Sequence, residues 1–306
     1  MAEQEQGSDM SEQTGTLDMQ KPSILGEGPS KPDPVIIIDT GEKFTTMIFE
    51  TFQSPAAFIT DPAPLALYAT GRTTGLVVDA GHCRTAVVPV YEGFPLKHAV
   101  QDFPISGRDI GQYLGSLLAD SNPGIPMQKH IDTEMTMVKL KETMCSVASL
   151  RDPRLWQDPG EQEEYTLPDG ARIQCGKERY LATEPMFAPF VGLPSACLHT
   201  LSLSDVTFRG TLAQNVVLVG GTTLMPGFTK RLKQGLEEAT VFAGSSAPVT
   251  IPYEVAASSD PRYAAWQGGS MLSELSTFRS MCIDNSSEYD EYGPVMLRRK
   301  CWGICL

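Results

Sequence analysis

The sequence predicts an α/β fold built around a parallel sheet. Two short, continuous apolar runs, residues 35–38 and 216–219, have the length and composition of strands that are buried on both faces. Segments with apolar residues at helical spacing follow these runs, and strands that alternate with helices are typical of a parallel sheet. At 306 residues the chain is long enough for about two domains.

Residues 1–33 differ in composition from the rest of the chain. They hold seven acidic residues against two lysines, a net charge of −5, and few large apolar residues. Such a segment cannot bury enough apolar surface to offset the entropy lost on ordering. We therefore expect a disordered acidic tail.

The elements that follow are predicted from periodicity and capping residues. Helices are expected over residues 44–52, 64–70 with a proline in the first turn, 106–118 with Ser106 as N-cap, 132–148 with Asp132 as N-cap, and 263–281. Strands are expected at 35–38 and 57–60, in a hairpin on either side of residues 79–83, on either side of LPDG (167–170), and at 216–219 before a double-glycine turn and a helix. The first two strands leave a small sheet with one uncovered edge. The acidic stretch 152–164 is expected to be a loop.

The composition excludes several classes of function. A net charge of −13 repels phosphate backbones and anionic lipid surfaces, so we expect neither a nucleic-acid partner nor a membrane partner. No apolar run approaches the length of a membrane span, and the acidic N-terminus is not a signal peptide. The seven cysteines and four histidines stand at no metal-ligand spacing, which predicts reduced thiols and no metal site.

Two glycine-containing turns are candidate anion sites. In the hairpin turn at residues 79–83 (Asp-Ala-Gly-His-Cys), the glycine can expose backbone N–H groups in a concave nest, and an ordinary hairpin turn is the alternative. Gly220 and Gly221 follow a buried strand and open a helix, where a ligand can approach backbone N–H groups. A tight strand-to-helix connection is the alternative there. The pattern is neither GxGxxG nor a P-loop.

Several longer stretches occur together in one order along the chain. They are MIFETFQSPA (47–56), LYATGRTTGLVVDAG (67–81), VPVYEGFPLKHA (88–99), GRDIGQYL (107–114), LPDG (167–170), VGGTTLMPGF (219–228), WQGGSMLSELSTF (266–278) and EYDEYGPVMLRRKC (288–301). In this order they resemble the actin family, and among its members the short, tissue-restricted actin-like proteins of mammals, several of them from testis. The resemblance implies an actin-type fold, as in actin, Hsp70 and hexokinase, with two α/β halves around a nucleotide cleft. It assigns residues 34–74 and 263–306 to a remnant of the first large subdomain, and residues 75–262 to the second half.

The resemblance also assigns nine nucleotide-binding positions. Asp79 matches the aspartate that holds the water shell of the metal, and Gly81 belongs to the second phosphate-binding turn. The other seven positions match residues along the nucleoside: Gly107 beside the nucleotide, Lys141 and Glu142 at the adenosine, Gly220, Gly221 and Thr222 in its backbone cradle, and Arg262 where the family usually has a lysine near the base.

The phosphate half of the site departs from the family pattern. About the first quarter of an actin, with its first phosphate loop and small flexible subdomain, has no counterpart here, and residues 79–83 replace Asp-Ser-Gly-Asp-Gly. Pro62 stands in place of the glutamine that orients the attacking water, and Ala86 in place of the histidine behind it. We therefore expect no ATP hydrolysis, no required cofactor, and at most weak binding of ATP or ADP. Contact of His82 and Arg84 with a phosphate is the alternative, and solvent-facing turn residues are the simpler reading.

A groove that accepts amphipathic helices of partner proteins is the second implied site. Phe94 replaces a tyrosine of the family at this groove. Because Leu272, Leu275 and Met281 stand at helical spacing, burial in the core is the alternative for them. The positions that match the groove are Tyr68, Ala69, Gly71, Thr73, Gly93, Phe94, Leu272, Leu275, Thr277 and Met281.

Together these features predict a non-catalytic actin-like protein that works through protein contacts. Its expected partners are actin or actin-binding proteins, and its expected location is the cytoplasm, with the cytoskeleton. One alternative is an ATP-binding actin relative that co-assembles with actin filaments. The other is a nuclear actin-related subunit of a chromatin complex.

Overall fold

The computed structural model describes residues 47–131, 133–150, 162–242, 252–258, 260–293 and 295–300. All of them belong to one unit of the chain, residues 37–306. The expected acidic tail and the strand predicted at 35–38 lie outside the described residues. Among the described helices, none is both long enough and apolar enough to cross a membrane.

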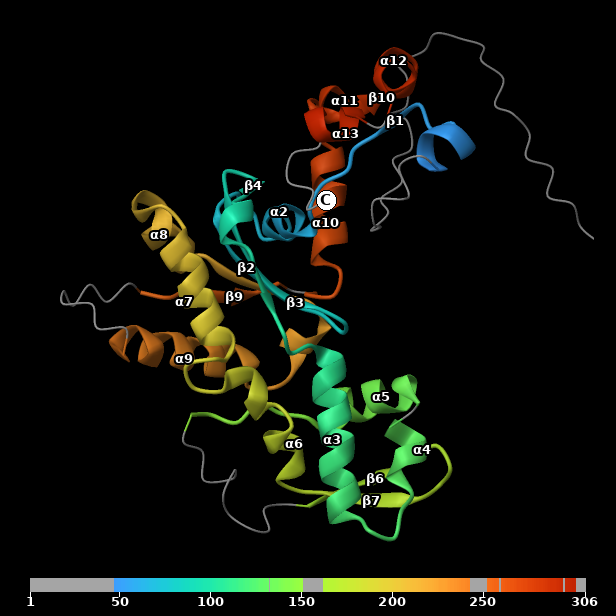
Figure 1. Ribbon diagram of the computed structural model, residues 1–306, viewed down its shortest axis with the longest axis vertical. Coiled ribbons are helices and arrows are strands. Elements are labelled where there is room, and N and C mark those ends of the chain that lie inside the picture. The colour runs from blue at the N-terminus through green and yellow to red at the C-terminus, as the bar shows by residue number, and fades with distance from the viewer. Residues whose placement is uncertain are drawn as a thin grey trace, which may run out of the picture. The chain divides into compact units, whose positions relative to one another are not determined.

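A mixed sheet of six strands lies at the centre of this unit (Figure 1). Strands β2, β8 and β9 run parallel, while β3 pairs antiparallel with β2, β4 and β5. The parallel arrangement is therefore confirmed for three strands. The hairpin at residues 79–83 makes β3 antiparallel to β2, and β4 and β5 each pair antiparallel with β3. The strands are β2 (Gly75–Ala80), β3 (Thr85–Tyr91), β4 (Phe94–Pro95), β5 (Gln101–Phe103), β8 (Val216–Val219) and β9 (Val255–Ala257).

Two groups of buried apolar side chains cover the two faces of the sheet. Because side chains alternate along a strand, Leu76 and Val78 join one group while Val77, between them, joins the other. Helices α3, α5, α7 and α9 contribute to the first group, and α2 and α10 to the second. These helices are α2 (Pro62–Tyr68), α3 (Gly107–Ser121), α5 (Glu134–Met144), α7 (Leu193–Leu203), α9 (Phe228–Phe242) and α10 (Ala264–Ser273).

Local sequence signals account for the starts of two helices. Helix α2 begins two residues earlier than predicted, because the Asp61 carboxylate accepts the N–H of Ala63 at 2.9 Å and Pro62 occupies the first helical position. Ser106 caps α3 as predicted, and the Asp109 carboxylate accepts both its backbone N–H and its hydroxyl, at 2.7 and 2.6 Å. The Ser106 hydroxyl also lowers the pKa of Asp109.

Four predicted helices or turns differ from the structure. Of the helix predicted over residues 44–52, the structure describes residues 47–52, and these contain only the single turn η1 (Met47–Thr51). The N-cap of α5 is Thr133, and the predicted cap Asp132 lies outside the described residues. The helix after the double glycine begins only at Phe228, and the helix predicted over 263–281 stops at Ser273 and resumes as α11 (Phe278–Met281). That break accompanies an edge-to-face contact between Phe278 and Phe58, with ring centroids 5.8 Å apart.

The strand predicted at 57–60 is the short β1 (Ala56–Ala57), whose partner comes from the far end of the chain. It pairs antiparallel with β10 (Ile283–Asp284), a strand that local patterns did not reveal. The expected uncovered edge stays a prediction, because residues 35–38 lie outside the described residues. Beside them a separate apolar cluster contains Phe49, stacked on Tyr289 at 4.3 Å, together with Ile283 and Met296.

Strands β6 and β7 pair antiparallel and form the hairpin predicted around LPDG. The acidic stretch 152–164 lies mostly outside the described residues, and its last two residues begin β6. The remaining elements are η2 (Lys97–Ala99), α4 (Met127–Ile131), β6 (Glu163–Thr166), β7 (Arg172–Cys175), α6 (Glu178–Leu181), η4 (Glu184–Phe187), α8 (Val206–Ala213), η5 (Gly221–Leu224), η6 (Asn285–Tyr289), α12 (Asp290–Tyr292) and α13 (Val295–Lys300).

Candidate functional site

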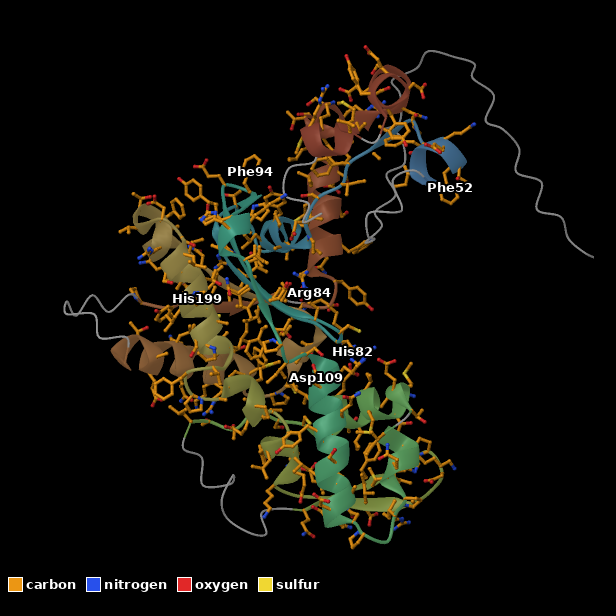
Figure 2. The ribbon with its side chains drawn as sticks, in the orientation of Figure 1. Phe52, His82, Arg84, Phe94, Asp109 and His199 are labelled. Atoms are coloured by element: carbon orange, nitrogen blue, oxygen red, sulfur yellow. The ribbon has the colours of Figure 1, made fainter. Side chains whose placement is uncertain are left out.

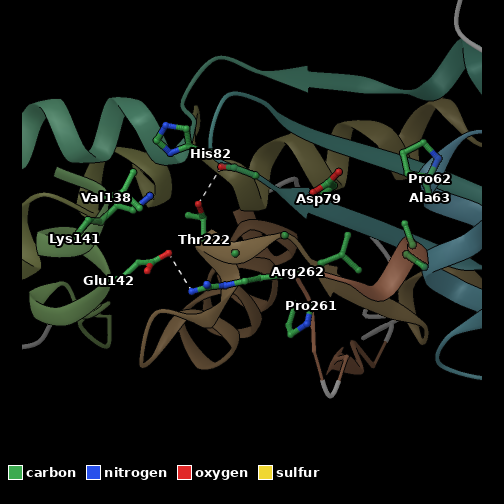
Figure 3. A pocket seen from close by; sticks show the side chains of 16 residues that line it. Pro62, Ala63, Asp79, His82, Val138, Lys141, Glu142, Thr222, Pro261 and Arg262 are labelled. Atoms are coloured by element: carbon green, nitrogen blue, oxygen red, sulfur yellow. Dashed lines mark hydrogen bonds and ion pairs between the residues drawn. The ribbon is translucent and has the colours of Figure 1, made fainter. Parts of the chain in front are cut away.

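A cavity of about 380 Å³ lies at the carboxyl ends of β2 and β8 (Figure 3). These strands are parallel neighbours, so Asp79 at the end of β2 lies beside Val219 at the end of β8. Crevices at the carboxyl ends of parallel strands are the usual ligand sites of α/β sheets. Eight of the nine predicted nucleotide positions line this cavity: Asp79, Gly81, Lys141, Glu142, Gly220, Gly221, Thr222 and Arg262.

Gly81 joins three elements at the cavity wall. Its N–H donates to the carbonyl oxygen of Arg84 at 2.9 Å, which closes the hairpin. Its carbonyl oxygen accepts the N–H of Gly107 and the hydroxyl of Thr222, both at 3.0 Å. The Gly81 N–H is therefore engaged within the hairpin and does not point to a ligand.

The turn at position 220 requires glycine, which has no side chain. Its φ of 88° lies in the left-handed region, and a Cβ there would collide with the carbonyl oxygen of Ala80. The Gly220 N–H donates to Pro261 at 2.8 Å. The turn opens the short η5 and not the predicted long helix, since Gly227, with a φ of 89°, turns the chain again before α9 begins.

Both cationic side chains near the expected nucleoside already have partners. Lys141 is only 5% exposed, and its Nζ donates to the carbonyl oxygen of Gly107 at 2.9 Å. Burial lowers the pKa of Lys141. The Arg262 guanidinium donates to the Glu142 carboxylate at 3.0 Å across the cavity wall (Figure 3). Any ligand that uses these groups must compete with these contacts.

The sequence model of the actin family matches residues 38–302. The chain belongs to the actin family. Its mixed α/β sheet with helices on both faces is the actin-type fold that the sequence predicted. The cavity of this actin-family protein lies at the positions that the resemblance assigned to the nucleotide.

Gly107, the ninth predicted position, lies in the wall between this cavity and a second one. A Cβ at Gly107 would collide with the Thr222 hydroxyl and approach Lys141 Nζ to 2.6 Å. The second cavity, of about 410 Å³, shares His82 and Val138 with the first. It is lined by His82, Gly107, Arg108, Gly111, Gln112, Gln128, Ile131, Glu134, Met137 and Val138.

On the side of Asp79, the neighbouring residues that line the cavity of this actin-family protein are small and apolar. Figure 3 shows Pro62 and Ala63 on the side of Asp79, with Lys141 and Glu142 on the opposite side. Ala86 lies directly across the hairpin from Asp79 and is buried. Sequence reasoning missed several lining residues, because small apolar side chains carry no chemical signal; these are Ala63, Ala66, Val138, Val219, Pro261 and Ala265.

His82 and Arg84 of the β2–β3 turn, both labelled in Figure 2, each have a carboxylate partner. His82 lines the cavity, and its Nε2 lies 2.7 Å from the Glu134 carboxylate. Arg84 is not among the lining residues and pairs with Asp102 at 2.5 Å on the surface. Of the two alternative phosphate contacts, only His82 therefore stands at the cavity. Elsewhere in the described part of the chain, no group of three or more His, Cys, Asp or Glu is placed to hold a metal ion.

The predicted partner groove combines exposed and buried positions. Phe94 on β4 (Figure 2) and Leu275 beyond α10 are 57% and 53% exposed, while Leu272 is buried, as the core alternative expects. The N–H of Gly93 donates to Thr73 at 2.7 Å and brings the β3–β4 turn to the loop after α2. Of the remaining positions, Gly71, Thr73, Thr277 and Met281 are exposed, and Tyr68, Ala69 and Gly93 are half-buried.

Proposed function

We propose that this actin-family protein is non-catalytic, acts through protein contacts, and binds adenine nucleotides weakly at most. The observation that carries the proposal is the apolar cavity wall beside Asp79, formed by Pro62, Ala63 and Ala66. Hydrolysis of a nucleoside triphosphate depends on charges and polar groups that position the phosphates and orient the attacking water. These three side chains provide no such group, and beside them Asp79 supplies one carboxylate.

The polar side chains of the opposite wall are engaged within the protein. A general base must lie within about 3 Å of the water it activates, directly or through one further water. Lys141 is bound to the Gly107 carbonyl, and Glu142 is bound to Arg262. The net charge of −13 further opposes the approach of a triphosphate. These observations support weak binding without turnover.

Phosphate release and calorimetry test this proposal. The purified chain with MgATP should release no phosphate above the protein-free rate. Titration with ATP, with and without magnesium, should give a Kd of about 1 mM or weaker, which corresponds to about −4 kcal/mol. Magnesium-dependent binding in the micromolar range, or phosphate release in proportion to protein concentration, would contradict the proposal and favour an ATP-binding relative that co-assembles with filaments.

The exposed apolar side chains of the groove support the protein-contact part of the proposal. Apolar grooves accept the apolar face of an amphipathic helix, and a few anchoring side chains carry most of the binding free energy. Phe94 and Leu275 are the most exposed large apolar side chains among the groove positions and are the candidates for such anchors. We propose partners with amphipathic helices, among them actin-binding proteins, in the cytoskeleton of the cytoplasm.

Anisotropy titrations with fluorescent amphipathic helical peptides test the groove. Phe94→Asp and Leu275→Asp should each weaken binding by about tenfold or more, because an anchor loses its apolar contacts. Val206→Asp is the matched control, since Val206 is also exposed but lies on α8. Equal loss in all three variants would show that the groove is not the binding surface. Affinity purification that recovers chromatin-remodelling subunits would favour the nuclear alternative.

A further inference from the structure

One carboxylate oxygen receives three hydrogen bonds where the two cavities meet. Oε1 of Glu134 lies 2.7 Å from Nε2 of His82, 2.7 Å from Nη2 of Arg108 and 3.0 Å from Nε of Arg108. An ionised carboxylate only accepts, so all three nitrogens donate. The donors come from the β2–β3 turn and from the first turn of α3, whereas Glu134 begins α5. Together His82 and Arg108 form a cradle for an anion, and Glu134 fills it.

Glu134 fills this cradle without being part of the core. Its side chain is 57% exposed, and those of His82 and Arg108 are 35% and 48% exposed. Bonds from His82 and Arg108 lower the pKa of Glu134, so it is charged at neutral pH. An exposed side chain at a helix start can rotate away while the buried face of α5 stays in place. The carboxylate is therefore an occupant that another anion can replace.

The position of His82 connects the cradle to the candidate nucleotide cavity. His82 lines both cavities, while Arg108 and Glu134 line the second. Because His82 also lines the first cavity, a phosphate ester whose nucleoside part lies near Lys141 and Thr222 can place its anionic end at His82. There it would meet the negative charge of Glu134 and find the donors occupied.

We infer that Glu134 is autoinhibitory: it occupies an anion subsite made by His82 and Arg108, and its removal opens that subsite to the phosphates of a nucleoside diphosphate in the adjoining cavity. The inference rests on the proposed weak nucleotide binding and gives one reason for it. Because the three side chains are exposed, the competition is moderate and weakens with salt.

Calorimetric titration of the full chain with ADP and with adenosine tests the inference. Glu134→Ala should bind ADP about tenfold more tightly than the unsubstituted protein at low ionic strength, since two charge-assisted donors become available. Adenosine has no anionic group, so its affinity should not change. Adding Arg108→Gln to Glu134→Ala should remove most of the gain for ADP. Glu134→Gln keeps the side-chain shape without the charge and should show a gain in the same direction.

Asp120→Asn is the matched control, because it removes one negative charge from an exposed position of α3 that is not among the residues lining either cavity. It should leave ADP affinity unchanged. Thermal unfolding identifies any variant that fails to fold. If Glu134→Ala fails to fold, Glu134→Gln alone tests the inference. Three results would overturn the inference: no gain for ADP, an equal gain with Asp120→Asn, or an equal gain for adenosine. Tight magnesium-dependent ATP binding by the unsubstituted protein would instead contradict the proposed function, and the ratio between variant and unsubstituted protein would still decide the role of Glu134.

Discussion

Single residues at the cavity are held by close approaches that leave little room for change. Gly220 has a left-handed backbone and lies against the carbonyl of Ala80. Lys141 reaches the carbonyl of Gly107 from a buried position. Both residues match nucleotide-binding positions of the family, yet in this structure each has a role within the protein itself.

Gly220→Ala should destabilise the fold by about 3 kcal/mol, because the new methyl group adds a collision to an unfavourable φ. Gly170→Ala is the matched control: its φ is 86°, close to that of Gly220, but nothing lies within 4 Å of the new Cβ. It should cost only about 1 kcal/mol. Urea unfolding measures both. Similar losses of unfolding free energy in the two variants would show that the collision with the Ala80 carbonyl does not contribute to the effect.

Lys141 should make the free energy of unfolding depend on pH in the alkaline range. Its pKa is lowered in the folded state by burial, so the folded protein loses this proton at a lower pH than the unfolded chain. As pH rises through the folded pKa toward the unfolded value of about 10.4, the unfolded state binds more protons and stability increases.

The measurement is urea unfolding of the unsubstituted protein and of Lys141→Met at a series of pH values. The unsubstituted protein should gain stability relative to Lys141→Met as pH rises through that window. Lys139→Met, at an exposed position of the same helix, should show no such trend. A constant difference between the unsubstituted protein and Lys141→Met would refute the expectation.

At the scale of elements, α2 and α10 pack closely against each other although they lie far apart in the sequence. Gly268 on α10 lies so near the carbonyl oxygen of Leu65 on α2 that a Cβ would overlap it. Both helices also pack on β2 and β8 through Ala63, Ala264 and their neighbours. The predicted division of the chain into residues 34–74 with 263–306 on one side and residues 75–262 on the other stays a prediction. Helices α2 and α10 belong to the first part, strands β2 and β8 to the second, and their side chains share one apolar cluster.

Two glycine-to-alanine substitutions in helices should therefore have opposite effects. Gly268→Ala should lower the free energy of unfolding by about 2 kcal/mol or more, since one helix must move away from the other. Gly210→Ala on α8 meets no atom within 4 Å and should raise it by about 0.5 to 1 kcal/mol, the helix propensity gained. Thermal or urea unfolding measures both. A stabilising Gly268→Ala would show that α10 can shift freely.

At the scale of the whole described unit, apolar burial is unevenly distributed. The sheet and its helices hold the two large clusters, while Phe49, Ile283, Tyr289 and Met296 form a small one around β1 and β10. Stability within a protein follows the local extent of buried apolar contacts. The small cluster should therefore open more readily than the central sheet.

Hydrogen exchange measures this difference. Amides of β1 and β10 should exchange with a lower opening free energy than amides of β2 and β8. Phe49→Ala should reduce protection further in residues 283–293 and leave that of β8 unchanged, because Phe49 stacks on Tyr289. An equal fall in protection across β8 would show instead that the two regions unfold as one cooperative unit.

The sequence by itself determined the family, the hairpin around residues 79–83, the strand at 216–219, the cap at Ser106 and the place of the candidate nucleotide cavity. These rest on local periodicity, caps and turn residues, or on motifs whose order alone is informative. Only the tertiary structure decided that β1 pairs with β10, that the last predicted helix breaks after Ser273, and that Lys141 and Glu134 are bound within the protein. The physical reason is the same in each case: such contacts join residues far apart in the chain, and local patterns of burial and charge do not specify their partners.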